Sequence, residues 1–250
     1  MSFLYIYIFI TSLMLGSFFN VVGLRVPLKQ SIVKPRSHCP SCGHTLGLLE
    51  LIPVLSYIIQ GGKCRRCKAS ISPLYPIVEL MTGVLFVFAP FVIGWVPELF
   101  IAWTLISLFV IVFVSDVKYM IIPDKVLLVF AVIFLLERIF LPLIPWWDSI
   151  AGAVVGFGLL LFIAVISNGG MGGGDIKLFA VIGFALGTKP VLLSFFFATL
   201  FGAVFGLVGR LIGKLEKGKP IPFGPFIGLG TLCAYFYGDT IVYWYLNSFI

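Results

Sequence analysis

The sequence predicts an all-α polytopic membrane protein with about eight transmembrane helices and a small cytoplasmic four-cysteine, zinc-type domain between helices 1 and 2. Of its 250 residues, 60% are apolar and only 11% are charged. The mean hydropathy of +1.15 is far above that of a water-soluble domain. The apolar residues form runs of about 20, the length of a helix that crosses a bilayer. These observations exclude a soluble globule and a protein with a single membrane anchor.

Eight apolar runs account for the predicted helices. They lie at residues 3–23, 76–95, 97–115, 121–143, 149–167, 176–187, 190–213 and 223–250. Strands of a membrane β-barrel would be about ten residues long and would alternate in hydropathy, so the length of these runs favours helices. The first run has no basic segment before it and no small-residue cleavage site after it, so we expect a retained helix. The sixth run opens at Asp175 and is short, which predicts a half-span or a tilted helix packed against protein.

The basic residues fall almost entirely on alternate connections between the runs. Fifteen of the 17 Lys and Arg residues lie in the odd-numbered connections, at residues 24–75, 116–125, 168–177 and 210–220, and the other two are Arg138 and Lys189. The positive-inside rule therefore places the odd connections in the cytoplasm and both termini outside. The net charge of +7 is explained by these loops, so we expect a lipid bilayer and not nucleic acid as the partner. The predicted domains are helix 1 at 1–23, the cysteine domain at 24–75 and a membrane domain at 76–250.

Four cysteines in the long first loop form two CxxC pairs separated by 21 residues. They are Cys39, Cys42, Cys64 and Cys67. This spacing is typical of a zinc ribbon or knuckle, in which four thiolates complete a closed, structural shell around Zn²⁺. A loop of about 50 residues is near the size at which an apolar core alone is marginal, so a crosslink is expected. Two disulfides or a CxxC redox couple are the alternatives, but a cytoplasmic loop is kept reduced.

Two carboxylates at helix ends are candidates for catalysis, because ionisable groups within membrane spans are expensive and mark functional sites. Asp116 ends the third run and Asp175 begins the sixth, so both are predicted at the cytoplasmic face. Two carboxyl groups at hydrogen-bonding distance share one proton, as in aspartic proteases. The ionised group can then take a proton from water while the protonated group polarises a carbonyl. The alternatives are an N-cap role for Asp175 and an ion pair between Asp116 and Lys118.

The segment before Asp175 is rich in glycine, with five Gly residues between 169 and 174. Backbone without side chains allows an extended peptide to approach closely, so Gly172, Gly173 and Gly174 are predicted to bind substrate. A glycine loop can also hold phosphate, but the segment lacks the GxxxxGK[ST] pattern and follows a membrane span, which argues against nucleotide binding.

Three further carboxylates lie near the predicted cytoplasmic face. Asp124 follows Pro123 and is either an N-cap of the fourth helix or a rival to Asp116. Glu50 and Glu79 lie on or beside the cysteine domain, where the simpler interpretation is ion pairing with nearby basic residues.

These features resemble the bacterial type IV prepilin peptidase and N-methyltransferase family, including its competence-system members. The resemblance runs nearly from end to end. It rests on these segments: Gly16-Ser17-Phe18-Phe19-Asn20, Arg25-Val26-Pro27, both CxxC pairs, Glu50-Leu51-Ile52-Pro53, Ser72-Pro73-Leu74-Tyr75-Pro76 leading to Glu79, Asp116 ahead of Ile122-Pro123-Asp124, and the GxGDxK motif at 172–177.

The resemblance implies a membrane aspartic endopeptidase that removes the short basic leader from type IV prepilins and pseudopilins after a Gly, at the cytoplasmic face of the bacterial plasma membrane. Asp116 and Asp175 would be the catalytic pair of the domain at 76–250. Family members also N-methylate the new N-terminus with S-adenosylmethionine, and the cysteine loop is associated with that activity, so we expect both activities. The substrate-binding residues would be Gly172, Gly173, Gly174, Lys177, Asp124, Glu50 and Glu79, with the three acidic residues attracting the leader.

Two other functions remain possible on the sequence alone. A second class of GxGD protease, of the signal-peptide-peptidase or presenilin type, cleaves within the bilayer, but the four loop cysteines argue against it. A transporter could use Asp116 and Asp175 to bind protons or cations, with the short sixth helix as a broken span. Proton-coupled flux in liposomes without peptide cleavage would select the transporter.

Overall fold

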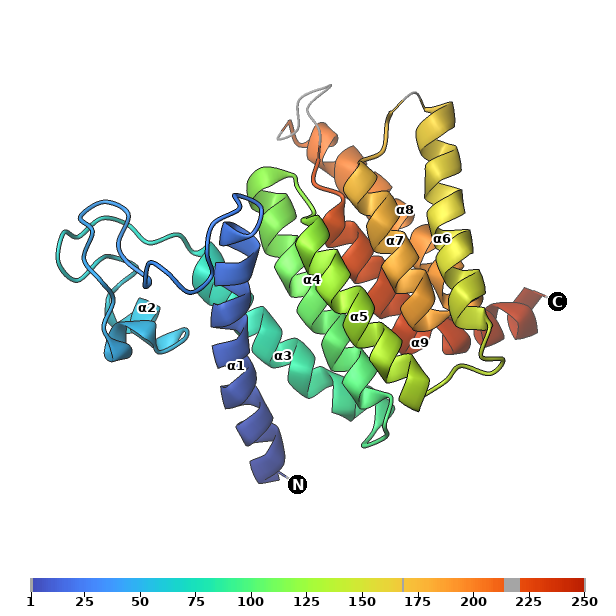
Figure 1. Ribbon diagram of the computed structural model, residues 1–250, viewed down its shortest axis with the longest axis horizontal. Helices are drawn as coiled ribbons and strands as arrows, with labels where there is room; N and C mark the ends of the chain where they lie inside the picture. Colours follow the sequence, from blue (N-terminus) through green and yellow to red (C-terminus); the bar gives the residue numbers. More distant parts are fainter. Residues whose placement is uncertain (1, 168, 214–220, 250) are drawn as a thin grey trace. The chain divides into compact units, whose positions relative to one another are not determined.

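The computed structural model describes residues 2–167, 169–213 and 221–249, and within these the secondary structure is helical apart from two isolated β-bridges. The all-α prediction is therefore confirmed for this part of the chain (Figure 1). The elements are α1 (Ser2–Arg25), the 3-10 helix η1 (Leu48–Leu51), α2 (Leu55–Ile59), α3 (Leu74–Ile93), α4 (Leu99–Tyr119), α5 (Asp124–Phe140), α6 (Asp148–Ile166), α7 (Gly173–Leu186), α8 (Thr188–Leu211) and α9 (Gly224–Phe249).

Five of the described helices are long and apolar enough to cross a membrane. They are α1, α3, α4, α6 and α8, which supports a multi-pass membrane protein. The run predicted to be short forms α7, with 14 residues. At 1.5 Å per residue this helix is about 21 Å long, less than the hydrocarbon core of about 30 Å. Part of the basic connection at 210–220 lies outside the described residues.

The chain forms two compact units that divide between Gly94 and Trp95. In the first, α1 packs against α3 through small residues, as is typical of helices in membranes. A Cβ added at Gly16 would lie 2.8 Å from the Cα of Glu79, so only glycine allows the two backbones to come this close. The predicted segments 1–23 and 24–75 thus share a unit with α3, which brings the cysteine loop and a membrane helix together.

The second unit is built around α4. In its most apolar stretch, 67% of α4 is buried, compared with 22% for both α6 and α8, which present apolar side chains outward. Helix α6 packs on α7, and α8 packs on α9. Glycines again permit the close contact of α6 with α7, because a Cβ added at Gly183 on α7 would overlap the backbone carbonyl of Gly152 on α6.

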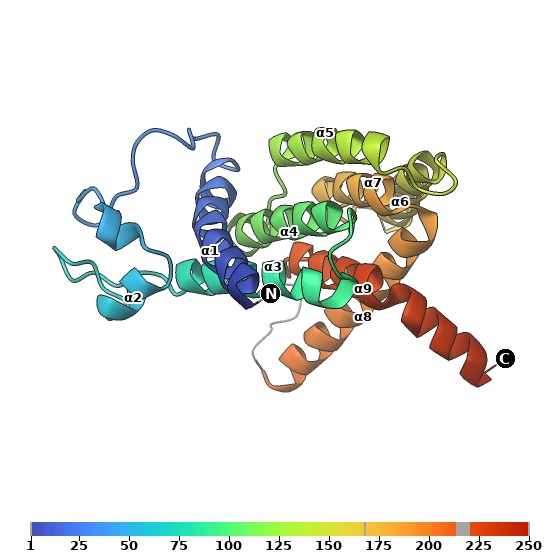
Figure 2. The same ribbon diagram turned by 90° about the horizontal axis from the view of Figure 1, so that it is seen from below.

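Helices α4, α5 and α7 lie side by side in the second unit (Figures 1 and 2). Figure 1 shows the end of α4 and the beginnings of α5 and α7 at the same end of this unit. The packing therefore brings together three helix ends that are far apart in the sequence, and the candidate site is built from them.

Candidate functional site

Asp116 lies in the last turn of α4, and its side chain is buried with 6% of the residue exposed. The helix stops at Met120, whose backbone is left-handed (φ 54°) and whose N–H donates to the Asp116 carbonyl at 2.8 Å. The Asp116 Oδ2 accepts a hydrogen bond of 2.7 Å from the backbone N–H of Gly224, the first residue of α9. Asp116 is thus held by a second helix, and within the described residues it forms no ion pair with Lys118.

Gly224 is a site residue that sequence reasoning missed. A Cβ at this position would lie 2.8 Å from Asp116 Oδ2 and 2.9 Å from Cγ1 of Val112. The Phe223-Gly224-Pro225 run signals the start of a helix, but no local pattern indicates which side chain that helix end contacts. The structure therefore adds the beginning of α9 to the predicted site.

Asp175 occupies the first turn of α7 and is partly buried. The N-cap of this helix is Gly172, with extended backbone (φ −69°, ψ 139°), so Asp175 lies inside the helix and is not its N-cap. The carboxyl group of Asp175 is close enough to that of Asp116 for the two charges to interact. Asp116 lies near the end of α4 and Asp175 near the beginning of α7, at the same end of the second unit (Figure 1); that the two act as a pair stays a prediction.

The glycines before Asp175 give this site an open side. A Cβ at Gly172 would lie 2.9 Å from Asp175 Oδ2, and one at Gly174 would lie 2.9 Å from the Cβ of Ile122. Gly173 has open space around it, and both Gly172 and Gly173 are exposed. A peptide backbone can therefore approach the Asp175 carboxyl along this segment, as expected from its composition.

The other predicted binding residues each have a partner within the protein. Lys177 Nζ lies 2.8 and 2.9 Å from the two carboxylate oxygens of Asp124, so this pair links the beginnings of α7 and α5. Glu50 Oε2 accepts from the N–H of Gly47 at 2.9 Å and lies 3.1 Å from Nε2 of His44.

Glu79 anchors the cysteine loop within the first unit. The N–H of Val54 donates to Glu79 Oε2 at 2.8 Å, and Val54 has a φ of 64°, which is unfavourable for a β-branched residue. A buried carboxylate on α3 therefore fixes a strained turn of the loop. That Glu50, Glu79 and Asp124 attract a basic leader stays a prediction.

The four loop cysteines converge in the first unit. Their sulfur atoms all lie within 4.8 Å of one another, and Cys39 Sγ is 3.7 Å from Cys67 Sγ. A disulfide would need about 2.05 Å, whereas sulfurs bound to one tetrahedral Zn²⁺ at about 2.3 Å are about 3.8 Å apart. The cysteines are free thiols in the structure. The donor set and its geometry thus fit zinc and not two disulfides.

The two CxxC pairs form matching turns. In the first, the Cys39 N–H donates to the His44 carbonyl, and in the second the Cys64 N–H donates to the Ala69 carbonyl. The residue after each pair has a positive φ, 68° at Gly43 and 61° at Lys68. Each turn directs backbone N–H groups at its first sulfur, as expected for a zinc knuckle.

These N–H groups change the acidity of the thiols. The N–H groups of Cys42 and Ser41 lower the pKa of Cys39 to about 6. Although the N–H of Ala69 acts in the same direction on Cys67, burial and the neighbouring thiols raise the pKa of Cys67 to about 11. Cys39 and Cys67 thus differ in acidity, and a Zn²⁺ ion held by the cluster would favour the thiolate form of its ligands.

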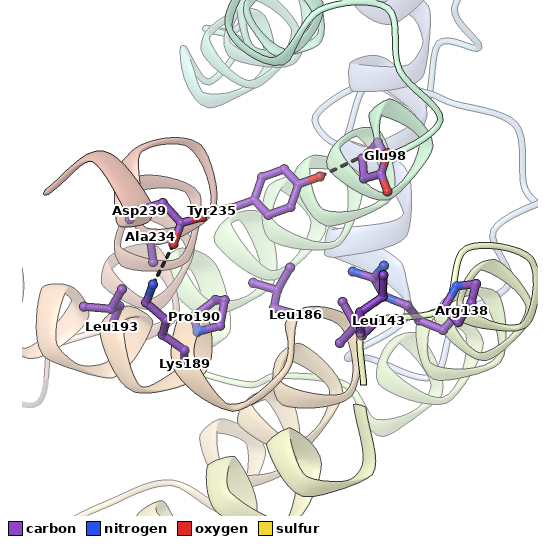
Figure 3. Close-up of a pocket in the computed structure, with 13 residues that line it drawn as sticks. Glu98, Arg138, Leu143, Leu186, Lys189, Pro190, Leu193, Ala234, Tyr235 and Asp239 are labelled. Atoms are coloured by element: carbon purple, nitrogen blue, oxygen red, sulfur yellow. Dashed lines mark hydrogen bonds and ion pairs between the residues drawn. The ribbon is translucent and has the colours of Figure 1, made fainter. Parts of the chain in front are cut away.

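A cavity of about 350 Å³ opens at the other end of the second unit, where α4 begins and α5 and α7 end (Figure 3). Its lining includes Arg138, whose Nε donates to the Ala185 carbonyl at 2.6 Å near the end of α7. Figure 3 also shows an ion pair of 2.8 Å between Lys189 and Asp239. Neither candidate catalytic aspartate lines this cavity, so it is separate from the site described above.

Comparison with protein families gives two matches. Residues 10–93 match the family described as bacterial peptidase A24 N-terminal domain, and this segment contains the four clustered cysteines. Residues 103–207 match the type IV leader peptidase family, and this segment contains Asp116 and Asp175.

Several proteins resemble the chain over nearly its whole length. A prepilin leader peptidase/N-methyltransferase of Bacillus subtilis is 47% identical over 240 residues, with 96% of this chain and 97% of the relative covered. Proteins of the same description from Aeromonas salmonicida and Pseudomonas aeruginosa are each 33% identical, covering 97% and 94% of this chain and 94% and 91% of the relatives. No solved structure matches this chain.

Proposed function

The chain belongs to the type IV leader peptidase family, and from this membership we propose that it removes the basic leader from type IV prepilins or pseudopilins after a Gly and then N-methylates the new N-terminus. The observation that carries the proposal is the placement of Asp116 at the end of α4 and Asp175 at the beginning of α7, on the same side of the second unit and beside an exposed glycine backbone. This arrangement suits hydrolysis of an extended peptide, because it combines two interacting carboxyl groups with space for a substrate strand.

In the proposed reaction the two aspartates share one proton. The ionised carboxylate takes a proton from water as the water oxygen bonds to the scissile carbonyl carbon, and the protonated carboxyl group gives its proton to the carbonyl oxygen. The C–N bond then breaks as the leaving nitrogen receives the proton taken from water, and the second carboxyl group recovers its own. The exposed backbone at Gly172 and Gly173 holds the substrate strand against Asp175.

The second activity is assigned to the cysteine loop. We infer that Cys39, Cys42, Cys64 and Cys67 hold one Zn²⁺, which has a structural role because the four thiolates leave no open position for catalysis. S-adenosylmethionine would supply the methyl group. The Val54 contact with Glu79 would connect this loop to α3.

We propose that the eight long helices of the described residues all cross the membrane, with the short α7 packed against protein, and that both termini lie outside the cytoplasm. The basic residues Lys118, Lys125 and Lys177 lie at the same end of the second unit as Asp116 and Asp175. The positive-inside rule then supports a cytoplasmic location for the aspartates. A prepilin whose apolar helix lies in the bilayer would present its basic leader on that side.

The experiment that tests this function incubates the purified protein in detergent with a prepilin, with and without S-adenosylmethionine, and measures the mass of the product. We expect loss of the leader in both samples and a gain of one methyl group only when the donor is present. Proton flux in liposomes without any cleavage would instead support the transporter.

Gly224 provides a test of how Asp116 is held. In Gly224→Ala the added Cβ would contact Asp116 Oδ2 and push the carboxyl group away from its position. Because small displacements at a reacting centre are costly, we expect kcat for cleavage to fall by about 10²-fold. The control is Gly158→Ala on α6, where a Cβ has open space, and it should retain wild-type kcat. Unchanged kcat in Gly224→Ala would show that this contact is not needed for cleavage.

A further inference from the structure

The ion pair between Lys177 and Asp124 joins the two chain segments that carry the candidate catalytic aspartates. Lys177 lies two residues after Asp175 on α7, and Asp124 begins α5, which follows Asp116 through a short connection. The ammonium group contacts both carboxylate oxygens, at 2.8 and 2.9 Å. This is the only ion pair between α5 and α7 within the described residues.

Asp124 lies in the first turn of α5, where the positive N-terminal end of the helix dipole favours a carboxylate. Lys177 is the fifth residue of α7, beyond its first turn, so the dipole has little effect on the ammonium group. The feature that sets Lys177 apart is its contact with both carboxylate oxygens of Asp124 on the neighbouring helix.

A second contact holds the same two segments on the other side of Asp175. Gly174 packs so closely on Ile122 that an added Cβ would lie 2.9 Å from the Ile122 Cβ. Asp175 is thus flanked by Gly174 and Lys177, and both contact the segment from Ile122 to Asp124. The position of Asp175 relative to the end of α4 therefore depends on these two contacts.

We propose that Asp124 and Lys177 are a positioning pair that holds Asp175 in register with Asp116, an inference that rests on the proposed function. The ion pair also compensates the charges of both side chains. The ammonium group of Lys177 offsets the negative charge of Asp124, and its contact with Asp124 keeps it from pairing with Asp175. This role differs from leader binding, in which Asp124 would offer its charge to the substrate.

The test exchanges the two charges. In Asp124→Lys and in Lys177→Asp, two like charges face each other, and we expect kcat for prepilin cleavage to fall by about 10- to 100-fold with KM little changed, because the aspartates lose their alignment. The double exchange restores an opposite-charge pair and should recover most of the lost kcat. The milder variants Asp124→Asn and Lys177→Met should change kcat in the same direction if a charge-reversed protein fails to fold.

A matched control exists in the same unit. Lys189 and Asp239 form an ion pair of the same length, 2.8 Å, at the opposite end of the helices (Figure 3). Both pairs are exposed, with side-chain exposures of 54% and 69% in the first and 60% and 94% in the control. Their contributions to stability should therefore be similarly small. Exchanging the charges of the control pair should leave kcat unchanged.

Three results would overturn the proposal. One is wild-type kcat in all Asp124 and Lys177 variants. Another is a rise in KM with kcat intact, which would assign these residues to leader binding. The third is a double exchange no more active than the poorer single variant. Failure of the proposed function is a separate outcome, because the wild-type protein would then cleave no prepilin.

Discussion

Replacing Asp116 with Asn is expected to reduce the rate of prepilin cleavage by at least about 10³-fold, and Asp175→Asn should have the same effect. An amide has nearly the same shape as a carboxyl group, so the packing of α4 and α7 should be preserved. It can neither take a proton from water nor share one with the remaining aspartate. Single-turnover cleavage of a prepilin, followed by product mass, measures the loss.

Asp239→Asn is the control for these variants, because Asp239 is an exposed carboxylate at the opposite end of the second unit. It should cleave at the wild-type rate. Asp124→Asn should lose less activity than either catalytic variant, since its role is to position Asp175. Full cleavage by Asp116→Asn combined with loss of cleavage in Asp124→Asn would identify Asp124 as the catalytic residue.

Replacing Cys64 with Ser is expected to remove the bound metal and to loosen the cysteine loop. Cys64 is 3% exposed and Cys39 is 7% exposed, so the metal would form the interior of this small domain. Structural Zn²⁺ contributes about 10–16 kcal/mol of apparent binding free energy in zinc-finger peptides, which is more than a loop of this size gains from its apolar core. We expect loss of zinc by elemental analysis and faster proteolysis between residues 36 and 70.

The same variant should separate the two activities. Methyl incorporation into a precleaved pilin should fall by at least about 10-fold, because the loop to which we assign this activity loses its structural ion, while leader removal should continue. Cys233→Ser is the matched control, as Cys233 lies on α9 outside the cluster. Zinc-free wild-type protein with a protease-resistant loop would contradict the metal assignment, and so would a titration that finds no free thiol among the four clustered cysteines after denaturation with a chelator.

Short-range patterns were sufficient to predict the cysteine cluster and the open glycine segment. In Cys39-Pro-Ser-Cys42 the spacing alone lets two thiols face one ion. Consecutive glycines have no side chains to fill the space around them, so an open segment follows from their composition. The pairing of Asp116 with Asp175 needed one further step, because both were expected at the same membrane depth. In the structure Asp116 lies in the last turn of α4 and Asp175 in the first turn of α7, at the same end of the second unit.

Contacts between distant segments could not be predicted in the same way. The Gly224 N–H lies 108 residues from Asp116 in the sequence, and nothing in the pattern around either residue indicates the contact. Asp124 and Lys177 were each identified as candidate binding residues, but periodicity does not show which charges face each other across two helices. Glu79 was expected to form ion pairs, whereas it accepts a backbone hydrogen bond from Val54.

The most direct test of the account asks whether Asp116 and Asp175 act as one catalytic unit. The single-turnover cleavage rate of the Asp116→Asn, Asp175→Asn double variant is compared with the rates of the two single variants. If the two carboxyl groups work only together, the double variant should cleave no more slowly than the slower single variant. Losses that multiply in the double variant would show that each aspartate acts independently and would contradict a shared-proton pair.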